Sequence, residues 1–166
     1  MENINYEIEK KFIIKYPDLK MLKDISEYTE IEQIYLLNED GFSERIRKRG
    51  KDGVFKYYHT LKKRVSAIKR IEEEKIISEK EYEKLKERAN PKLNVIYKTR
   101  YCMPYFKHVL EIDVFPFWKK QAFLEIELEN ETEEYKLPEY LEIISDVSTD
   151  SAYTNRALSE QIPDEI

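Results

Sequence analysis

The chain has 166 residues, of which 41% are hydrophobic and 38% charged, with a formal net charge of -5 at pH 7. This length suggests one domain with a substantial core, and the negative charge argues against non-specific nucleic-acid binding through a broad basic surface. No apolar run is long enough to span a membrane. The single cysteine and the lack of a signal-peptide pattern fit a reducing, cytoplasmic compartment.

Alternation of apolar and polar residues predicts eight strands, mostly antiparallel. These strands are expected at residues 3–15, 30–37, 42–49, 54–62, 67–77, 92–103, 105–115 and 121–129. Helices are expected at residues 19–27 and 79–88, in a short piece near Pro138, and at 155–161. Turn residues at 38–41 and 50–53 predict hairpins.

Each predicted strand places several charges on one face. In the first strand Glu7, Glu9 and Lys11 would point the same way, because side chains alternate along a strand. A solvated edge strand would also account for this stretch taken alone. The pattern recurs, however, with acidic and basic sets on separate strands. The acidic sets are Glu111 with Asp113, and Glu125 with Glu127 and Glu129; the basic sets are Arg45, Arg47 and Arg49, and Lys98 with Arg100.

A closed barrel with a charged interior explains this segregation, because interior and exterior residues alternate along its strands. We therefore predict an α+β fold, an eight-stranded antiparallel β-barrel with helices packed outside. The basic groups would bind a polyphosphate, and the carboxylates would bind a hard divalent cation such as Mg²⁺ or Mn²⁺. With only three glycines the chain has no glycine-rich phosphate loop, so side chains must hold the phosphates.

The ordered motifs resemble those of the CYTH family, also called triphosphate tunnel metalloenzymes, and especially its small bacterial inorganic triphosphatases. The family's Glu-x-Glu-x-Lys motif is present at residues 7–11. Further matches are Gln-x-Tyr-Leu at 33–36, Arg-x-Arg at 45–47, Thr-x-Lys at 60–62, Arg-x-Glu-x-Glu at 70–74, Lys-Thr-Arg-Tyr at 98–101, the acidic strands at 111–115 and 125–127, and Tyr-x-Asn at 153–155. Residues 65–67 and 117–120 depart from the family's glycine-containing loops, which bears on substrate preference.

The resemblance implies one CYTH-like domain over residues 1–166 and a role for each matching position. The metal ligands would be Glu7, Glu9, Asp113, Glu125 and Glu127. The phosphate-binding residues would be Lys11, Arg45, Arg47, Lys62, Arg70, Lys98 and Arg100. Glu72 and Glu74 would orient arginines or assist the metal, and Tyr35 would help to activate water. A phenol is a poor base at neutral pH unless its pKa is shifted, so the alternative for Tyr35 is a wall residue that hydrogen-bonds a phosphate or carboxylate.

The expected activity is metal-dependent hydrolysis of inorganic tripolyphosphate or another linear triphosphate. One divalent ion would bridge phosphate oxygens and a second would acidify the attacking water. An adenylate cyclase shares the fold and most motifs, although no segment can be assigned to adenine or ribose. A non-catalytic polyphosphate-binding module would not need the acidic sets, and a purely structural sheet would leave segregated like charges unexplained. The expected partner is a small-molecule triphosphate, without nucleic acid or membrane, and the protein would be a monomer or homodimer.

Overall fold

The computed structural model describes residues 4–38 and 42–166, which contain nine strands in one sheet. The strands are β1 (Ile4–Lys15), β2 (Glu27–Tyr35), β3 (Ser43–Lys51), β4 (Val54–Arg64), β5 (Lys69–Ile77), β6 (Ile96–Tyr105), β7 (His108–Val114), β8 (Gln121–Glu127) and β9 (Ile143–Asp146). The helices are α1 (Leu19–Ile25), α2 (Glu79–Leu85) and α3 (Asn155–Glu160), with 3₁₀ turns η1 (Lys86–Arg88) and η2 (Ser151–Tyr153).

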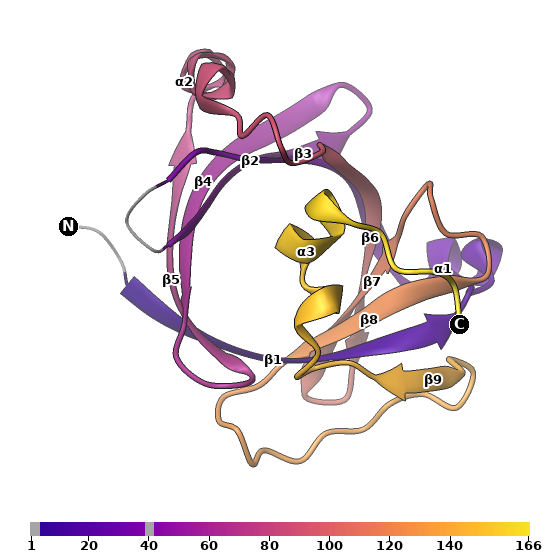
Figure 1. Ribbon diagram of the computed structural model, residues 1–166. Coiled ribbons are helices and arrows are strands. Elements are labelled where there is room, and N and C mark those ends of the chain that lie inside the picture. The colour runs from indigo at the N-terminus through magenta and orange to yellow at the C-terminus, as the bar shows by residue number, and fades with distance from the viewer. Residues whose placement is uncertain (1–3, 39–41) are drawn as a thin grey trace.

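Eight of the strands close into a barrel, which Figure 1 shows as a ring. Neighbouring strands follow the order β5-β4-β3-β2-β6-β7-β8-β1, and antiparallel pairing of β1 with β5 closes the circle. The ninth strand, β9, pairs with the C-terminal half of β1 outside the ring. The predicted eight-stranded antiparallel barrel is therefore confirmed.

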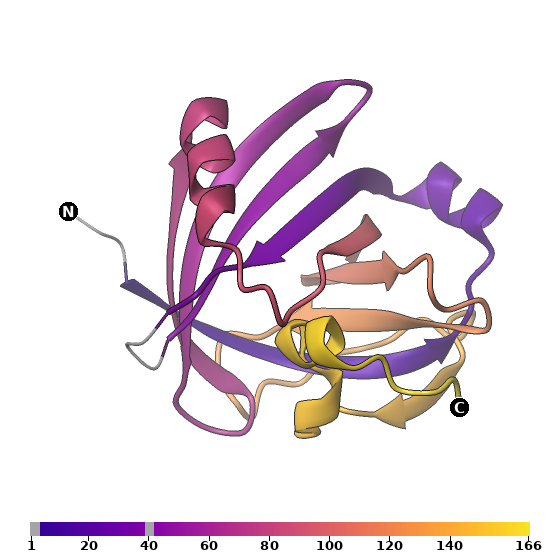
Figure 2. The same cartoon turned by 45° about the horizontal axis from the view of Figure 1, so that its top comes forward.

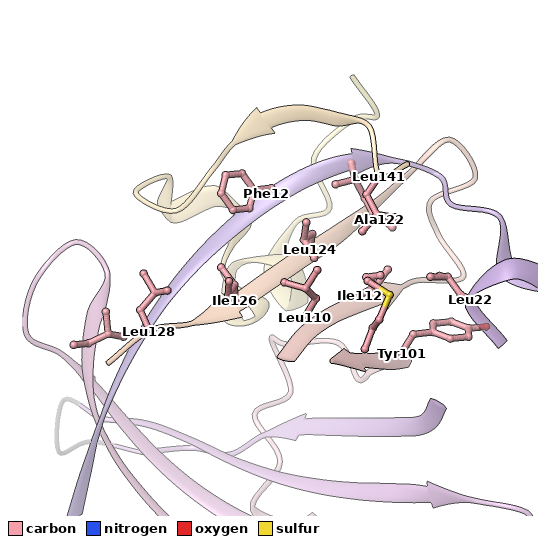
Figure 3. Packing of buried hydrophobic residues seen from close by; sticks show 13 residues of the cluster. Phe12, Leu22, Tyr101, Leu110, Ile112, Ala122, Leu124, Ile126, Leu128 and Leu141 are labelled. Carbon is pink, nitrogen blue, oxygen red and sulfur yellow. The ribbon is translucent and has the colours of Figure 1, made fainter. Parts of the chain in front are cut away.

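The largest apolar cluster lies on the outer faces of β1, β6, β7 and β8 (Figure 3). Ile112, Leu124 and Ile126 are fully buried there, whereas the residues between them on the same strands are charged or point into the barrel. Burying one such side chain contributes roughly 1.5–3 kcal/mol to the free energy of unfolding. The period-two alternation thus fixes which side of each strand faces the interior.

Three segments cover the outer clusters. Leu22 of α1 packs on the β6–β8 cluster, and segment 128–142 also covers it through Leu128 and Leu141. Helix α2 covers β2, β3 and β5, where its fully buried Tyr82 donates a hydrogen bond from its hydroxyl to Glu32 Oε1 at 2.7 Å. Figure 2 shows α1 and α2 on opposite flanks of the barrel.

A second apolar cluster closes one end of the barrel interior. Ile13 of β1, Phe123 of β8 and Phe115, which directly follows β7, form this cluster, and Leu158 of α3 packs on them. Trp118 meets Phe123 edge to face, with ring centroids 5.0 Å apart. Helix α3 therefore lies across this end of the barrel, in the centre of the ring in Figure 1, while α1 and α2 lie outside it.

Several boundaries differ from the predicted ones. The expected short helix near Pro138 is wrong, because residues 138–141 form a single turn, closed by a hydrogen bond from Leu141 N–H to the Pro138 carbonyl at 3.1 Å, and strand β9 follows. Strand β7 begins at His108 instead of 105, because Phe106 adopts a positive φ of 53° in the β6–β7 turn. Most of the predicted turn at 38–41 lies outside the described residues. No helix in the described part of the chain is long and apolar enough to cross a membrane.

The β3–β4 hairpin predicts a contrast between its two glycines. A Cβ added at Gly50 would lie 1.9 Å from the carbonyl oxygen of Val54, so Gly50→Ala must distort the hairpin. We expect it to lower the free energy of unfolding by about 1–3 kcal/mol in urea denaturation. Gly53 has open space around it and a φ of +78°, which asparagine tolerates, so Gly53→Asn should cost much less. Equal losses in the two variants would contradict this account.

Candidate active site

The charged sets of the strands meet inside the barrel. In β1, Glu9 lies opposite Glu127 of β8, and Lys11 lies opposite Glu125. Glu7 lies opposite Arg70 of β5 and reaches Lys62 on β4. Because these strands are neighbours only in the closed ring, barrel closure brings together charges that are more than fifty residues apart in sequence.

The most buried charges form a cluster around Asp113. Its Oδ1 accepts a hydrogen bond from Arg100 Nε at 2.7 Å, and its Oδ2 accepts from Arg100 Nη2 and Lys98 Nζ, each at 2.8 Å. Arg100 also donates to Glu111 at 2.6 Å and to Glu125 at 3.3 Å. Both oxygens of Asp113 are thus held by cations, so in this arrangement Asp113 is their counter-ion. Its expected role as a metal ligand stays a prediction.

The environment of this cluster lowers the pKa values of both Asp113 and Lys98, for different reasons. Burial acts to raise the pKa of Asp113, but Arg100 and Lys98 outweigh burial and hold the pKa far below its usual range. Burial lowers the pKa of Lys98 to about 7 against the attraction of Asp113. The charge of Lys98 therefore depends on an intact Asp113.

A second group joins β1, β4 and β5. Lys62 Nζ donates to the two carboxylate oxygens of Glu7 at 3.0 and 3.2 Å and lies 3.3 Å from Glu72 Oε2. Burial would raise the pKa of Glu7, but Lys62 and a hydrogen bond with Glu72 bring it well below its usual value. Burial and the neighbouring Glu7 raise the pKa of Glu72 to about 7. One lysine thus neutralises one of two adjacent carboxyl groups, and Glu72 makes no hydrogen bond or ion pair with an arginine among the described residues.

Glu9, Glu125 and Glu127 form a carboxylate group with too few cations. Burial, then Glu125, then Glu7 raise the pKa of Glu9 to about 8, and its nearest cation, Arg70 Nη1, is 3.9 Å away. Buried Glu125 Oε1 has no hydrogen bond, although Lys11 Nζ lies 3.2 Å from it. Burial and the nearby Glu7 and Glu111 also raise the pKa of Glu127.

This carboxylate group has the donor chemistry of a hard divalent-cation site. Crowded carboxylate oxygens that repel one another are stabilised by Mg²⁺ or Mn²⁺, which prefer oxygen ligands. Within residues 4–38 and 42–166, no three His, Cys, Asp or Glu side chains are already arranged as a metal site. The residues therefore fit such an ion by their chemistry and by the unbonded oxygen of Glu125.

Arg45 and Arg47 are the buried cations that lack a counter-ion. Neither has a described carboxylate within 4.0 Å, and Arg45 Nε is buried without a hydrogen bond. Arg47 Nε and Nη2 donate to Gln33 Oε1 at 3.0 and 2.6 Å, and Gln33 Nε2 donates to the Tyr35 hydroxyl at 2.7 Å. Burial and the positive charges of Arg45 and Arg100 lower the pKa of Arg47 to about 9. This pair requires an anion, because buried unpaired charge is costly.

A cavity of about 220 Å³ is lined by Arg45, at the end of the barrel that η2 and α3 cover. Its cationic lining consists of Lys11, Arg45, Lys62, Arg64, Arg70 and Arg156. Glu9 is the one carboxylate among the described residues that line it, and Tyr35, Ser43, Thr154 and Asn155 complete its polar wall. A larger hollow of about 790 Å³ has no arginine among its described lining residues. The smaller cavity is therefore the candidate anion site.

The structure brings most of the sequence-derived residues into this interior, but Glu74 lies at its exposed side, where it accepts a hydrogen bond from Thr60 Oγ1 at 2.8 Å. Sequence reasoning gave no role to Gln33, although that residue belongs to the motif at 33–36. It also missed Arg64 and Arg156, whose only sequence signal was an unpaired positive charge near a motif.

A closed antiparallel barrel whose interior carries segregated acidic and basic sets is the architecture of a triphosphate-tunnel protein. Comparison with solved structures agrees. The inorganic triphosphatase NE1496 shares 26% identity, with 95% of this chain and 97% of that chain covered and a TM-score of 0.60. HpAC1 from Hippeastrum, an adenylyl cyclase candidate with a dominant triphosphatase activity, has 14% identity over 74% and 80% of the chains and a TM-score of 0.53.

An adenylate cyclase candidate from Bacillus halodurans has 17% identity over 75% of this chain and 81% of that one, with a TM-score of 0.50. At such identities these last two likenesses show the fold alone. No family model and no curated protein matches the sequence. The chain has the fold of the triphosphate-tunnel proteins, and the resemblance indicated by its motifs is confirmed.

The raised pKa values of Glu9 and Glu72 predict how the free energy of unfolding depends on pH in the absence of metal. Glu9 and Glu72 have folded pKa values of about 8 and about 7, against 4.5 for an unperturbed glutamate. Between these values the folded state binds more protons than the unfolded state, so the free energy of unfolding should fall as pH rises from about 5 to about 6.5. Glu7 and Asp113, with lowered pKa values, act only below this window.

Urea denaturation in EDTA at several pH values measures this slope. Glu9→Gln should make it shallower, because the variant removes the group with the higher pKa. A stability that is flat or rises across this window would contradict the account, as would an unchanged slope in the variant.

The Asp113 cluster predicts a large loss for a nearly isosteric change. Asp113→Asn removes the charge that holds Lys98 and Arg100 and leaves two buried cations without their main counter-ion. We expect a loss of about 3–5 kcal/mol in the free energy of unfolding. Glu87→Gln, at an exposed carboxylate of η1 outside the barrel interior, serves as the control and should change stability by about 0.5 kcal/mol or less. Similar losses in both would show that the Asp113 contacts contribute little.

Proposed function

We propose that this protein hydrolyses inorganic tripolyphosphate, or another linear triphosphate, with the help of Mg²⁺ or Mn²⁺. The observation that carries the proposal is the 220 Å³ cavity with six cationic side chains and one carboxylate in its described lining. Its arginines need a ligand with several negative charges, and the carboxylate group beside it suits the cation that accompanies polyphosphates. The triphosphatase activity of NE1496, at 26% identity over nearly the whole chain, supports the same reaction class.

The basic residues would bind and orient the phosphates. Arg45, with its free Nε, and Arg47, held by Gln33, would donate to oxygens of the phosphate that is transferred. Phosphoryl transfer depends mainly on such positioning and on neutralisation of the equatorial oxygens. Lys11 and Lys62 already carry carboxylate partners at 3.2 and 3.0 Å and would hold the flanking phosphates from opposite sides.

The carboxylates would provide the metal site. Glu9, Glu125 and Glu127 would hold the cation, with Glu7 beside them, whereas Asp113 would keep Lys98 and Arg100 in place. A bound divalent ion would polarise phosphate oxygens and acidify the attacking water. Because Glu9 has a raised pKa, binding of the cation would also release a proton from it.

Tyr35 would act as a binding residue. Its hydroxyl accepts a hydrogen bond from Gln33 at 2.7 Å and lines the cavity, which leaves its own proton free to be donated to a phosphate oxygen. We assign Tyr35 this binding role because its hydroxyl oxygen already accepts the hydrogen bond from Gln33 Nε2. The O–H of Tyr35 can therefore donate to another group.

The test is a product analysis with purified protein, tripolyphosphate and either Mg²⁺ or Mn²⁺. We expect equal amounts of pyrophosphate and orthophosphate, faster turnover than with ATP, and complete loss of activity in EDTA. Phosphorus NMR identifies the products, and far-ultraviolet circular dichroism checks that chelation leaves the fold intact.

Glu125→Gln should remain folded but lose more than about 100-fold in turnover, since even partners of metal ligands cost 10–100-fold when mutated. The exposed Glu87→Gln is the matched control on η1 and should be fully active. Cyclic AMP as the main product from ATP would instead identify a cyclase. Tripolyphosphate that binds without turnover under either metal would identify a non-catalytic polyphosphate-binding module.

A further inference from the structure

Two guanidinium groups at the mouth of the anion cavity have no anionic partner among the described residues. Arg64 ends strand β4 and Arg156 lies in α3, and both line the cavity. Neither side chain makes a hydrogen bond or an ion pair within residues 4–38 and 42–166. The nearest aromatic contact of Arg156 is the Tyr35 ring, 6.0 Å from its Cζ to the ring centroid. Both residues are exposed, in contrast to the buried Lys11 and Arg45 deeper in the same cavity.

The surroundings concentrate positive charge at this mouth. Arg64 lies directly opposite Arg70 in the β4–β5 ladder, and like charges in that position repel. Arg156 comes from a segment that Lys11 anchors through its Nζ hydrogen bond to the Tyr153 carbonyl at 3.1 Å. The contact of Lys11 therefore holds the segment that carries Arg156. The positive charges of Arg64, Arg70 and Arg156 favour an anion between β4 and α3.

We propose that Arg64 and Arg156 are specificity-determining residues that bind the outermost phosphate of a linear polyphosphate. This inference rests on the proposed function. The buried lining residues are Lys11, Arg45 and Tyr35. The two cations suit phosphates, and Tyr35 is only 3% exposed, so its ring leaves a nucleobase little surface for stacking. The nucleoside of ATP would therefore lie at the mouth, where it carries no negative charge for the two arginines. A bare phosphate end does carry that charge, so the pair favours inorganic chains over nucleoside triphosphates.

The test compares two substrates in matched variants. KM and kcat are measured for tripolyphosphate and for ATP, with Mg²⁺ or Mn²⁺, in the wild type, Arg64→Gln/Arg156→Gln, Arg64→Lys/Arg156→Lys and Lys80→Gln. Lys80 is an exposed residue of α2 away from the cavity and serves as the control. The glutamine pair should raise KM for tripolyphosphate by about 10- to 100-fold, because two charge-assisted contacts are lost.

The other readouts separate specificity from general damage. The kcat for tripolyphosphate and the KM for ATP should change by less than about threefold in the glutamine pair, and the lysine pair should recover most of the tripolyphosphate KM. Thermal unfolding should be unchanged, because both side chains are exposed and unpaired. Equal losses for both substrates, or no loss for either, would overturn the proposal.

A binding measurement makes this result independent of catalysis. Isothermal titration calorimetry of tripolyphosphate in EDTA should show weaker binding to the glutamine pair than to the wild type. If this difference appears but no triphosphate is hydrolysed with either metal, the proposal that Arg64 and Arg156 bind the outermost phosphate is supported and the proposed triphosphatase activity is wrong. If the variants hydrolyse tripolyphosphate with the wild-type KM, the activity stands and the arginine pair fails. If the wild type does not bind tripolyphosphate with or without metal, both fail.

Discussion

The structure depends on the neutralisation of charges that barrel closure forces into a shared interior. Eight strands, each with charges on one face, leave several of those charges buried once β1 pairs with β5. Burial of an unpaired ion is costly, so each interior charge must find a partner or a ligand. The positions of the interior side chains show which charges find a partner within the protein and which require a ligand.

The side chains of the interior neutralise some of these charges completely and others only in part, and the charges left without partners indicate function. Around Asp113 the neutralisation is complete, with both carboxylate oxygens held by Lys98 and Arg100. Around Arg45 the cations outnumber the carboxylates, and around Glu9 the carboxylates outnumber the cations. The completed cluster acts as a rigid support, while the two incomplete regions lie side by side and are suited to a polyphosphate and its metal ion.

The apolar shell holds this arrangement in place. Outer clusters on β1, β6, β7 and β8 and beneath α2 fix the strands, and the aromatic group around Phe123 closes one end. Side chains in such a close-packed core change position only at a cost, so the charged groups keep their separation when no ligand is bound. The C-terminal segment belongs to this framework and also to the site, because it packs Leu158 on the end cluster and brings Arg156 to the cavity.

The sequence by itself determined the strands, their inward faces and the sign of the charges on each, because alternation and composition are local properties. The ordered motifs also indicated the family. Only the tertiary structure decided which charges meet, since partners such as Lys62 and Glu7 depend on closure and strand register between distant segments. The role of Asp113 as a counter-ion, the short β9 strand and the placement of Arg156 were invisible for the same reason. They arise from how the chain returns on itself, and no local pattern encodes that path.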